Sequence, residues 1–202
     1  MSGTGTRRSH SILERDADLL EAALGRLPRR AERPRVVVMV GLPGSGKSFL
    51  ARAVARRTPA VVLDSDAMRS VLFAEPRHTK REHGRLFPAL HLVMERLLAR
   101  GYSIVVDATN LKEVSRRPYY KIAEKCGAPV VLVRTWAPAP VIRKRLLDRS
   151  EARDADDRST ATVEVYERMR SGAERLTKEH VSVDTSRDIG PAVDKIVSML
   201  QS

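Results

Sequence analysis

Short hydrophobic runs alternate with longer amphipathic stretches along most of the chain. Five runs have the length of strands and lie at residues 36–40, 60–63, 103–107, 129–134 and 180–183. Stretches with apolar residues at helical spacing lie at residues 47–57, 66–73, 81–100, 116–125, 139–149, 163–179 and 191–200. No hairpin signal joins consecutive strands, so the alternation predicts an α/β fold with a parallel five-stranded sheet sandwiched by helices. Ligands of such sheets bind beyond the carboxyl ends of the strands.

A further helix is predicted ahead of the first strand, over residues 11–27. Ser11 and Glu14 have the spacing of a capping box at its start. A proline ends the helix, and a polar, proline-bounded linker follows. We therefore expect an N-terminal helical extension and linker at residues 1–34 and the main domain at residues 35–202.

Composition narrows the class of protein. The chain has 202 residues, of which 42% are hydrophobic, enough for the core of one domain of ordinary size. Its longest unbroken apolar stretch, Val36 to Leu42, is far shorter than the roughly 20 residues that a membrane-spanning helix needs. The single cysteine, Cys126, cannot form an internal disulfide or a Cys-rich zinc site. With no secretory signal visible, we expect a cytoplasmic protein without a membrane partner.

The charge of the chain favours polyanionic partners. Lys and Arg number 37 against 25 Asp and Glu, which gives a net charge of +12 and suits nucleic acids or nucleotides. However, 29 of these cations are Arg and only 8 are Lys, a bias that GC-rich coding also produces. Charge alone therefore leaves both interpretations open.

Residues 41–48 read Gly-Leu-Pro-Gly-Ser-Gly-Lys-Ser and match the phosphate-binding pattern G-x-x-x-x-G-K-[ST]. The match follows a predicted buried strand and opens a predicted helix, which is the context that gives it meaning. Glycines let successive backbone N–H groups converge on phosphate oxygens at the positive end of the helix. Lys47 is expected to reach the β- and γ-phosphates, and the Ser48 hydroxyl to hold Mg²⁺. The predicted ATP-binding residues are Gly41, Pro43, Gly44, Ser45, Gly46, Lys47 and Ser48.

The end of the third strand argues against water as the phosphoryl acceptor. Asp107 ends this strand and is the second predicted Mg²⁺ ligand, beside Ser48. Ala108 follows it at the position where motor and switch ATPases need an acid to position water. This favours transfer to another hydroxyl group.

The end of the second strand supplies a candidate general base. Asp66 lies where a carboxylate would face the phosphate-binding loop across the cleft and take the proton of an attacking hydroxyl. Arg69, three residues later, shares its helical face and could hold an acceptor phosphate or orient the base. The alternative is that Asp64 or Asp66 only caps the helix.

The phosphate-binding loop, Asp66-Ala67-Met68-Arg69 and Asp107-Ala108-Thr109-Asn110 together resemble the P-loop kinases related to phage-type 5′-hydroxyl polynucleotide kinases. The resemblance covers roughly residues 35–200 and implies a P-loop kinase-like fold. It implies that Asp66 is the general base and that Arg69 contacts the 3′-phosphate of the acceptor.

The resemblance also places Thr109 and Asn110 at the substrate, since the family carries Thr-Asn-Leu after the third strand. The polynucleotide kinases commonly have Asp immediately before this Thr, whereas here Ala108 stands there. Related small-molecule kinases share Asp-Ala-Thr-Asn, so this segment does not decide the substrate.

A set of arginines after the fourth strand predicts a helical lid at about residues 139–160. Arg145 and Arg149 are four apart and project from one helical face. In the resembling kinases two arginines at this spacing fold over the nucleotide and neutralise charge on the transferred phosphoryl group. Both are therefore catalytic candidates, with Arg145 also binding the nucleotide and Arg153 a weaker candidate. The alternative is a solvated helix with intrahelical ion pairs.

A few other residues are weaker candidates. Arg116 and Arg117 could line the acceptor cleft, and Trp136 could stack on a base or simply pack. Residues 183–186 end the fifth strand, where related kinases hold adenine through the backbone, although a simple turn fits equally well. The histidines share no metal-ligand spacing.

The predicted function is ATP-dependent, Mg²⁺-requiring transfer of the γ-phosphate to a hydroxyl. The favoured acceptor is the 5′-hydroxyl of a polynucleotide, on the strength of the D-x-x-R pattern, the positive charge and the lid. One alternative is a small-molecule kinase that acts on a sugar acid, an antibiotic or a nucleotide sugar. Another is a nucleotide-sensing or nucleic-acid-binding ATPase module, from which the water-positioning acid is missing.

Overall fold

A computed structural model of the chain describes residues 4–152 and 161–201. The strands are β1 (Val36–Val40), β2 (Ala60–Asp64), β3 (Ser103–Asp107), β4 (Val130–Trp136) and β5 (Val181–Asp184). The helices are α1 (Thr4–Ala23), α2 (Lys47–Ala55), α3 (Ser65–Leu72), α4 (Lys80–Ala99), α5 (Glu113–Lys125), α6 (Ala139–Ala152), α7 (Val163–Ser171) and α8 (Gly190–Gln201). All five predicted strands are present within one or two residues of their expected bounds.

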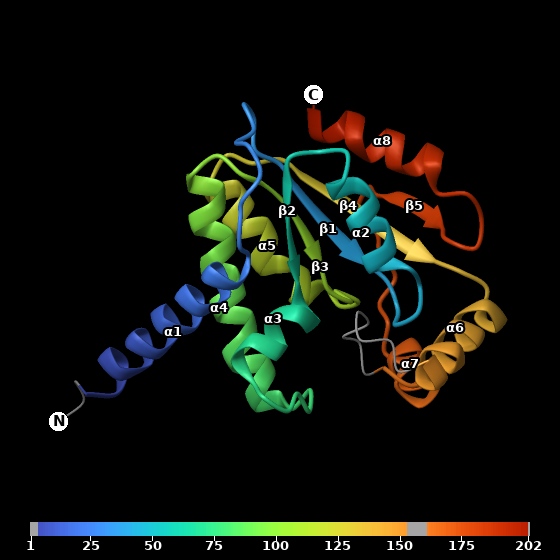
Figure 1. Ribbon diagram of the computed structural model, residues 1–202, viewed down its shortest axis with the longest axis horizontal. Coiled ribbons are helices and arrows are strands. Elements are labelled where there is room, and N and C mark those ends of the chain that lie inside the picture. Colours follow the sequence, from blue (N-terminus) through green and yellow to red (C-terminus); the bar gives the residue numbers. More distant parts are fainter. Residues whose placement is uncertain (1–3, 153–160, 202) are drawn as a thin grey trace.

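The five strands form one parallel sheet in the order β2-β3-β1-β4-β5. Alternate residues of β1 face opposite layers: Val38 packs in the cluster with α4 and α5, whereas Val37 packs in the cluster with α2 and α8. Helices α3, α6 and α7 lie beyond the carboxyl ends of the central strands (Figure 1). The predicted α/β sandwich is confirmed. The predicted site residues gather at the carboxyl ends of its strands.

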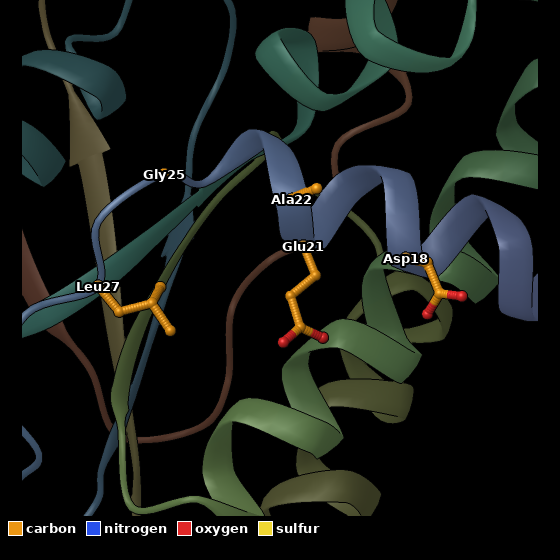
Figure 2. Close-up of a pocket in the computed structure, with 5 residues that line it drawn as sticks. All are labelled: Asp18, Glu21, Ala22, Gly25 and Leu27. Atoms are coloured by element: carbon orange, nitrogen blue, oxygen red, sulfur yellow. The ribbon is translucent and has the colours of Figure 1, made fainter.

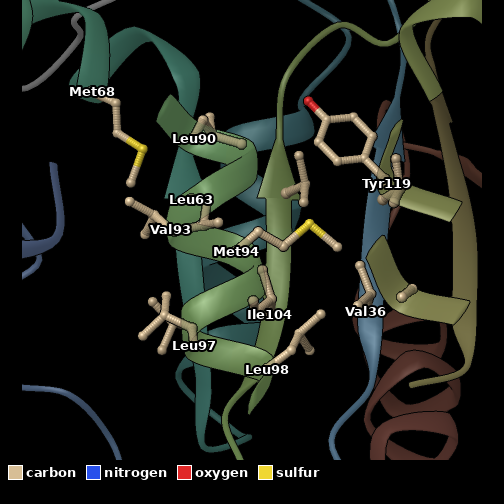
Figure 3. Packing of buried hydrophobic residues seen from close by; sticks show 14 of the residues in the cluster. Val36, Leu63, Met68, Leu90, Val93, Met94, Leu97, Leu98, Ile104 and Tyr119 are labelled. Carbon is tan, nitrogen blue, oxygen red and sulfur yellow. The ribbon is translucent and has the colours of Figure 1, made fainter. Parts of the chain in front are cut away.

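The larger core cluster lies between the sheet and α4 (Figure 3). Met94 and Leu98 of α4 lie on the side of Ile104 of β3, and Leu97 of α4 and Tyr119 of α5 belong to the same cluster. The apolar residues that the helical spacing of α4 places inward are all buried. Truncating one such Leu or Met to Ala typically costs about 2–5 kcal/mol, so this layer fixes where the strand ends lie.

Two helices, α1 and α7, differ from their predicted bounds by more than three residues. Helix α1 already includes Thr4, so Ser11 lies inside it and the predicted capping box is wrong. The helix ends at Ala23 because Gly25, at φ 64°, takes the left-handed conformation that terminates helices. Helix α7 ends at Ser171, and the chain then runs without helix to β5.

Helix α1 packs against α4 through apolar and charged contacts. Ala17 and Leu20 are buried in the larger core cluster. The carboxylate of Asp16, only 1% exposed, accepts hydrogen bonds of 2.5 and 2.7 Å from Arg85. The predicted extension thus contributes to the core, and the boundary at residue 34 stays a prediction.

A shallow hollow beside α1 is lined by Asp18, Glu21, Ala22, Gly25 and Leu27 (Figure 2). Its two carboxylates point towards α4, where Asp18 pairs with Arg96 and Glu21 pairs with Arg100. The hollow therefore belongs to the docking of α1 onto α4. In residues 4–152 and 161–201, no helix is both long and apolar enough to cross a membrane.

Candidate active site

The phosphate-binding loop connects β1 to α2 and depends on its glycines. Gly44 and Gly46 have φ values of 74° and 85°, in the left-handed region that costs other residues energy. A Cβ atom on Gly46 would also lie 2.9 Å from the side chain of Thr185. The backbone therefore turns sharply enough to direct its N–H groups into the space before α2.

Lys47 and Asp107 lie at the mouth of this loop. The Lys47 ammonium donates to the carbonyl of Leu42 at 3.1 Å, and burial lowers its pKa against the opposing charges of Asp107 and Asp66. Burial raises the pKa of Asp107 to about 6, although Lys47 and a hydrogen bond with Ser48 act in the other direction. The predicted Mg²⁺ ligands Ser48 and Asp107 are thus in contact.

A hydroxyl and a carboxylate suit Mg²⁺, which binds through one or two protein oxygens together with substrate phosphates and water. Among the described residues, no group of three or more His, Cys, Asp and Glu side chains could hold a metal. A divalent ion beside Ser48 and Asp107 would therefore need phosphate oxygens to complete its coordination.

Asp64 and Asp66 have separate roles at the start of α3. Asp64 is the N-cap, and its Oδ1 accepts the N–H groups of Asp66 at 2.9 Å and Ala67 at 3.1 Å. The carboxylate of Asp66 is half-buried, and burial followed by the charge of Asp64 raises its pKa. His78, Lys47 and Arg69 oppose this rise. The capping alternative thus applies to Asp64, and Asp66 lies within electrostatic reach of Lys47.

Arg69 is enclosed rather than open to the cleft. Its side chain is 2% exposed, and Nη1 donates to Oε2 of Glu82 at 3.2 Å. Glu82 also accepts the N–H groups of Arg77 and His78, and His78 has a φ of 53°. The Nε of Arg69 has no hydrogen-bond partner within the part of the chain that the structure describes. Its contact with an acceptor phosphate stays a prediction.

The segment after β3 supports the phosphate-binding loop. The carbonyl of Thr109 accepts the N–H of Gly41 at 3.0 Å. Asn110, at φ 48°, turns its side chain inward, and Nδ2 donates to the carbonyl of Met39 at 2.9 Å. The amide nitrogen of Asn110 is thus buried and bonded to β1, and its contact with the substrate stays a prediction.

Arg116 also differs from its predicted place in the acceptor cleft. It is fully buried, donates to the carbonyl of Asn110 at 2.7 Å and pairs with Glu113 at 3.0 Å. Its neighbour Arg117 is exposed. Arg116 thus holds the turn after β3 in place.

Helix α6 lies directly on the phosphate-binding loop. Arg145 donates to Oγ1 of Thr185 at 2.9 Å, to the carbonyl of Thr185 at 2.7 Å and to that of Gly44 at 3.3 Å. A Cβ atom on Gly44 would meet Ile142 and Leu146 at 3.0 and 3.1 Å. These two side chains would therefore have to shift to admit any other residue at Gly44.

Arg149 lies one turn further along α6, and its charge contributes to the lowered pKa of Lys47. Both predicted lid arginines are thus placed near the phosphate-binding loop. An intrahelical ion pair does form, between Lys144 and Asp148 at 3.2 Å, but it uses neither of them. Arg153 and residues 153–160 of the predicted lid lie outside the described residues.

Thr185 is a side-chain contact of the loop that no sequence pattern indicates. Its buried hydroxyl donates to the carbonyl of Ser45 at 2.9 Å and accepts from Arg145. Thr185 follows β5, 140 positions after Ser45, and a Thr after a strand carries no distinctive pattern. Only the fold brings the two residues together.

Comparisons with known proteins agree with this fold. The AAA_33 family model, an AAA domain, matches residues 36–176. The L-seryl-tRNA(Sec) kinase of Methanococcus maripaludis is 25% identical over 118 residues, which make up 57% of this chain and 46% of that protein. The chain thus matches about half the length of this relative.

Solved structures of kinases share the architecture. A putative kinase from Chloroflexus aurantiacus has a TM-score of 0.68 and 21% identity, over 84% of this chain and 100% of that one. The APS kinase of Mycobacterium tuberculosis, solved with AMPPNP and APS, has a TM-score of 0.65 and 23% identity, over 84% and 99%. The P-loop kinase fold is confirmed, and the finer likeness to polynucleotide kinases stays a prediction.

Proposed function

We propose that this chain, which belongs to the AAA_33 family of AAA domains, is an ATP-dependent, Mg²⁺-requiring kinase. The acceptor in this proposal is a hydroxyl, and specifically the 5′-hydroxyl of a polynucleotide. The observation that carries this proposal is that the two carboxylates at the start of α3 have different surroundings. Asp64 caps the helix, and Asp66 lies within electrostatic reach of Lys47.

The nucleotide half of the proposal rests on the phosphate-binding loop. Its backbone N–H groups and Lys47 would bind the phosphates of ATP, and Ser48 and Asp107 would hold Mg²⁺. When bound, Mg²⁺ neutralises charge on the β- and γ-phosphates. Arg145 and Arg149 on α6 would stabilise the charge that develops during transfer. The structure of APS kinase with AMPPNP, a relative in fold, supports this assignment.

The acceptor half rests on Asp66. The hydroxyl oxygen of the acceptor forms a bond to the γ-phosphorus, the bond from this phosphorus to ADP breaks, and Asp66 takes the hydroxyl proton. Ala108 offers no carboxylate that could position water in place of the acceptor. The expected reaction is therefore phosphoryl transfer with little hydrolysis of ATP.

Two observations support a polynucleotide acceptor. The net charge of +12 favours a polyanion, and the relative from Methanococcus maripaludis is a kinase of seryl-tRNA. The second candidate is a small-molecule kinase, and the enclosure of Arg69 favours it. An arginine that is 2% exposed and paired with Glu82 offers no open contact for an acceptor phosphate.

An acceptor screen with γ-labelled ATP and Mg²⁺ tests the proposal. We expect label on the 5′ end of hydroxyl-terminated RNA or DNA oligonucleotides, with transfer that weakens steeply as salt rises. The matched control is the same oligonucleotide with a 5′-phosphate, which should take no label. Label on a sugar acid, antibiotic or nucleotide sugar alone would favour the second candidate. Release of inorganic phosphate without any labelled acceptor would contradict both.

A further inference from the structure

A cavity of about 720 Å³ adjoins the phosphate-binding loop. Gly41, Leu42 and Ser45 of the loop form part of its wall, together with Leu111 from the segment between β3 and α5. The remaining wall comes from the end of β4, from α6 and α7, and from the segment that leads into β5. Its volume is in the range of small-ligand sites.

The alternation of side chains along β4 gives this cavity its chemistry. Val133 faces the α2 and α8 layer, whereas Leu132 faces the opposite layer and is buried near α5. Arg134 and Trp136 lie on the same face of β4 as Leu132. Both are exposed and line the cavity. Trp136 is 40% exposed, so this large aromatic ring is left partly uncovered at the edge of the sheet.

The wall of the cavity is rich in cations. Arg134 and Arg175 form no ion pair with any of the described residues, and Arg170 has only a 3.7 Å contact with Glu167. The acidic side chain on the wall, Glu174, accepts the backbone N–H of Glu113 at 2.7 Å. An aromatic ring beside cations without partners is an arrangement that binds single-stranded nucleic acid, by stacking bases and contacting phosphates.

We propose that this cavity binds the acceptor strand next to its reactive 5′ end. One base would stack on Trp136, and the flanking phosphates would contact Arg134, Arg170 and Arg175. The inference rests on the proposed function, because it takes the acceptor to be a polynucleotide. The position fits, since the cavity shares Gly41 and Leu42 with the loop at which the γ-phosphate is expected.

Trp136 is the single tryptophan of the chain, so its fluorescence reports on this cavity alone. We expect a single-stranded oligonucleotide with a 5′-phosphate, which binds without reacting, to quench the emission saturably. AMPPNP alone should leave it unchanged. Quenching by AMPPNP alone would assign the cavity to ATP, and an oligonucleotide that binds by anisotropy without quenching would place the strand elsewhere. Either result overturns the inference.

Variants of the wall give a second readout. Trp136→Ala should weaken oligonucleotide binding by roughly one order of magnitude, and Trp136→Phe should restore most of it. Arg134→Gln with Arg175→Gln should weaken binding and reduce its salt slope by about 2. The matched control is Arg26→Gln with Arg29→Gln, an equal change of charge at exposed positions between α1 and β1. Equal losses in both double variants would contradict a specific site.

The two proposals can fail separately. If the chain labels oligonucleotides but Trp136 does not respond, only the position of the strand is wrong. If oligonucleotides quench Trp136 but take no label, the site stands and the proposed reaction is wrong. If they neither bind nor take label, both proposals are overturned. Melting temperatures of the variants, compared with that of the natural chain, show whether each one folds.

Discussion

Asp64 and Asp66 show how one turn of chain gives two carboxylates different chemistry. Asp64 accepts two backbone N–H groups, which ties its charge to the start of α3. Asp66 lacks that stabilisation, and burial together with the charge of Asp64 raises its pKa. A carboxylate with a raised pKa is a better general base than an ordinary aspartate.

The pH profile of kcat/KM tests this account of Asp66. A general base must be deprotonated, so activity should rise with pH through its pKa, and the acidic limb should lie above about 4, the ordinary aspartate value. Asp64→Asn keeps a good N-cap but removes the like charge, so it should move this limb to lower pH. A limb that Asp64→Asn leaves in place would contradict the coupling.

The residues that the sequence revealed are those whose chemistry requires one residue type at a fixed spacing. Gly44, Gly46 and Lys47 could be assigned because a phosphate-binding loop tolerates little else. Glu82 and Thr185 could not, because they act on Arg69 and on the loop only after folding has brought distant segments together. The substrate contact of Asn110 stays a prediction, whereas its inward turn depends on a positive φ that no spacing indicates.

At the scale of elements, α6 connects the phosphate-binding loop to the end of β5. Its apolar side chains Ile142 and Leu146 contact the loop at Gly44. Arg145 bridges Gly44 and Thr185 with three hydrogen bonds. These bonds come from two nitrogens of one rigid, planar guanidinium, a geometry that the single nitrogen of a lysine ammonium lacks.

Removing this bridge should impair transfer more than folding. Arg145→Ala is expected to lower kcat by about 10³- to 10⁵-fold, in line with arginines that stabilise phosphoryl transfer. Arg143→Ala on the same helix is the control, because Arg143 is exposed and pairs with Glu167 of α7. Steady-state kinetics on both variants check the prediction. Equal effects would mean that the contacts of Arg145 contribute nothing specific to transfer.

Strand positions were predictable because a buried parallel strand is continuously apolar, as β1 is at all five positions. The ends of the helices were harder to predict than the positions of the strands. Helix α1 ends at a left-handed glycine rather than at Pro28, and α7 ends early at Ser171. After α7 the chain bonds to the turn following β3 instead, where the N–H of Glu174 donates to the carbonyl of Leu111 at 3.2 Å. Periodicity does not register such contacts between distant segments.

At the scale of the whole molecule, His91 of α4 should make the free energy of unfolding depend on pH. Its ring packs edge-on against Tyr119 at a centroid distance of 5.0 Å, and burial lowers its pKa to about 4. The unfolded chain protonates this histidine near pH 6.5. Between these two values the unfolded state binds more protons, so stability is lost as the pH falls from 6.5 towards 4.

The expected loss is about 1–3 kcal/mol, measured as the change in the free energy of urea unfolding across this pH range. His91→Phe should remove most of the pH dependence. His83→Gln, an exposed position on the same helix, should keep it. If the free energy of unfolding fell equally with pH in all three proteins, carboxylates elsewhere would be responsible for the loss of stability in acid.

The proposed reaction depends on a carboxylate at position 66 that faces the phosphate-binding loop and accepts the proton of the attacking hydroxyl. The most direct measurement compares Asp66→Asn with the natural chain, by calorimetric titration of ATP and by single-turnover transfer of labelled γ-phosphate to a 5′-hydroxyl oligonucleotide. We predict ATP affinity within about threefold and a transfer rate lower by about 10²- to 10⁴-fold. An unchanged transfer rate in Asp66→Asn would contradict the account.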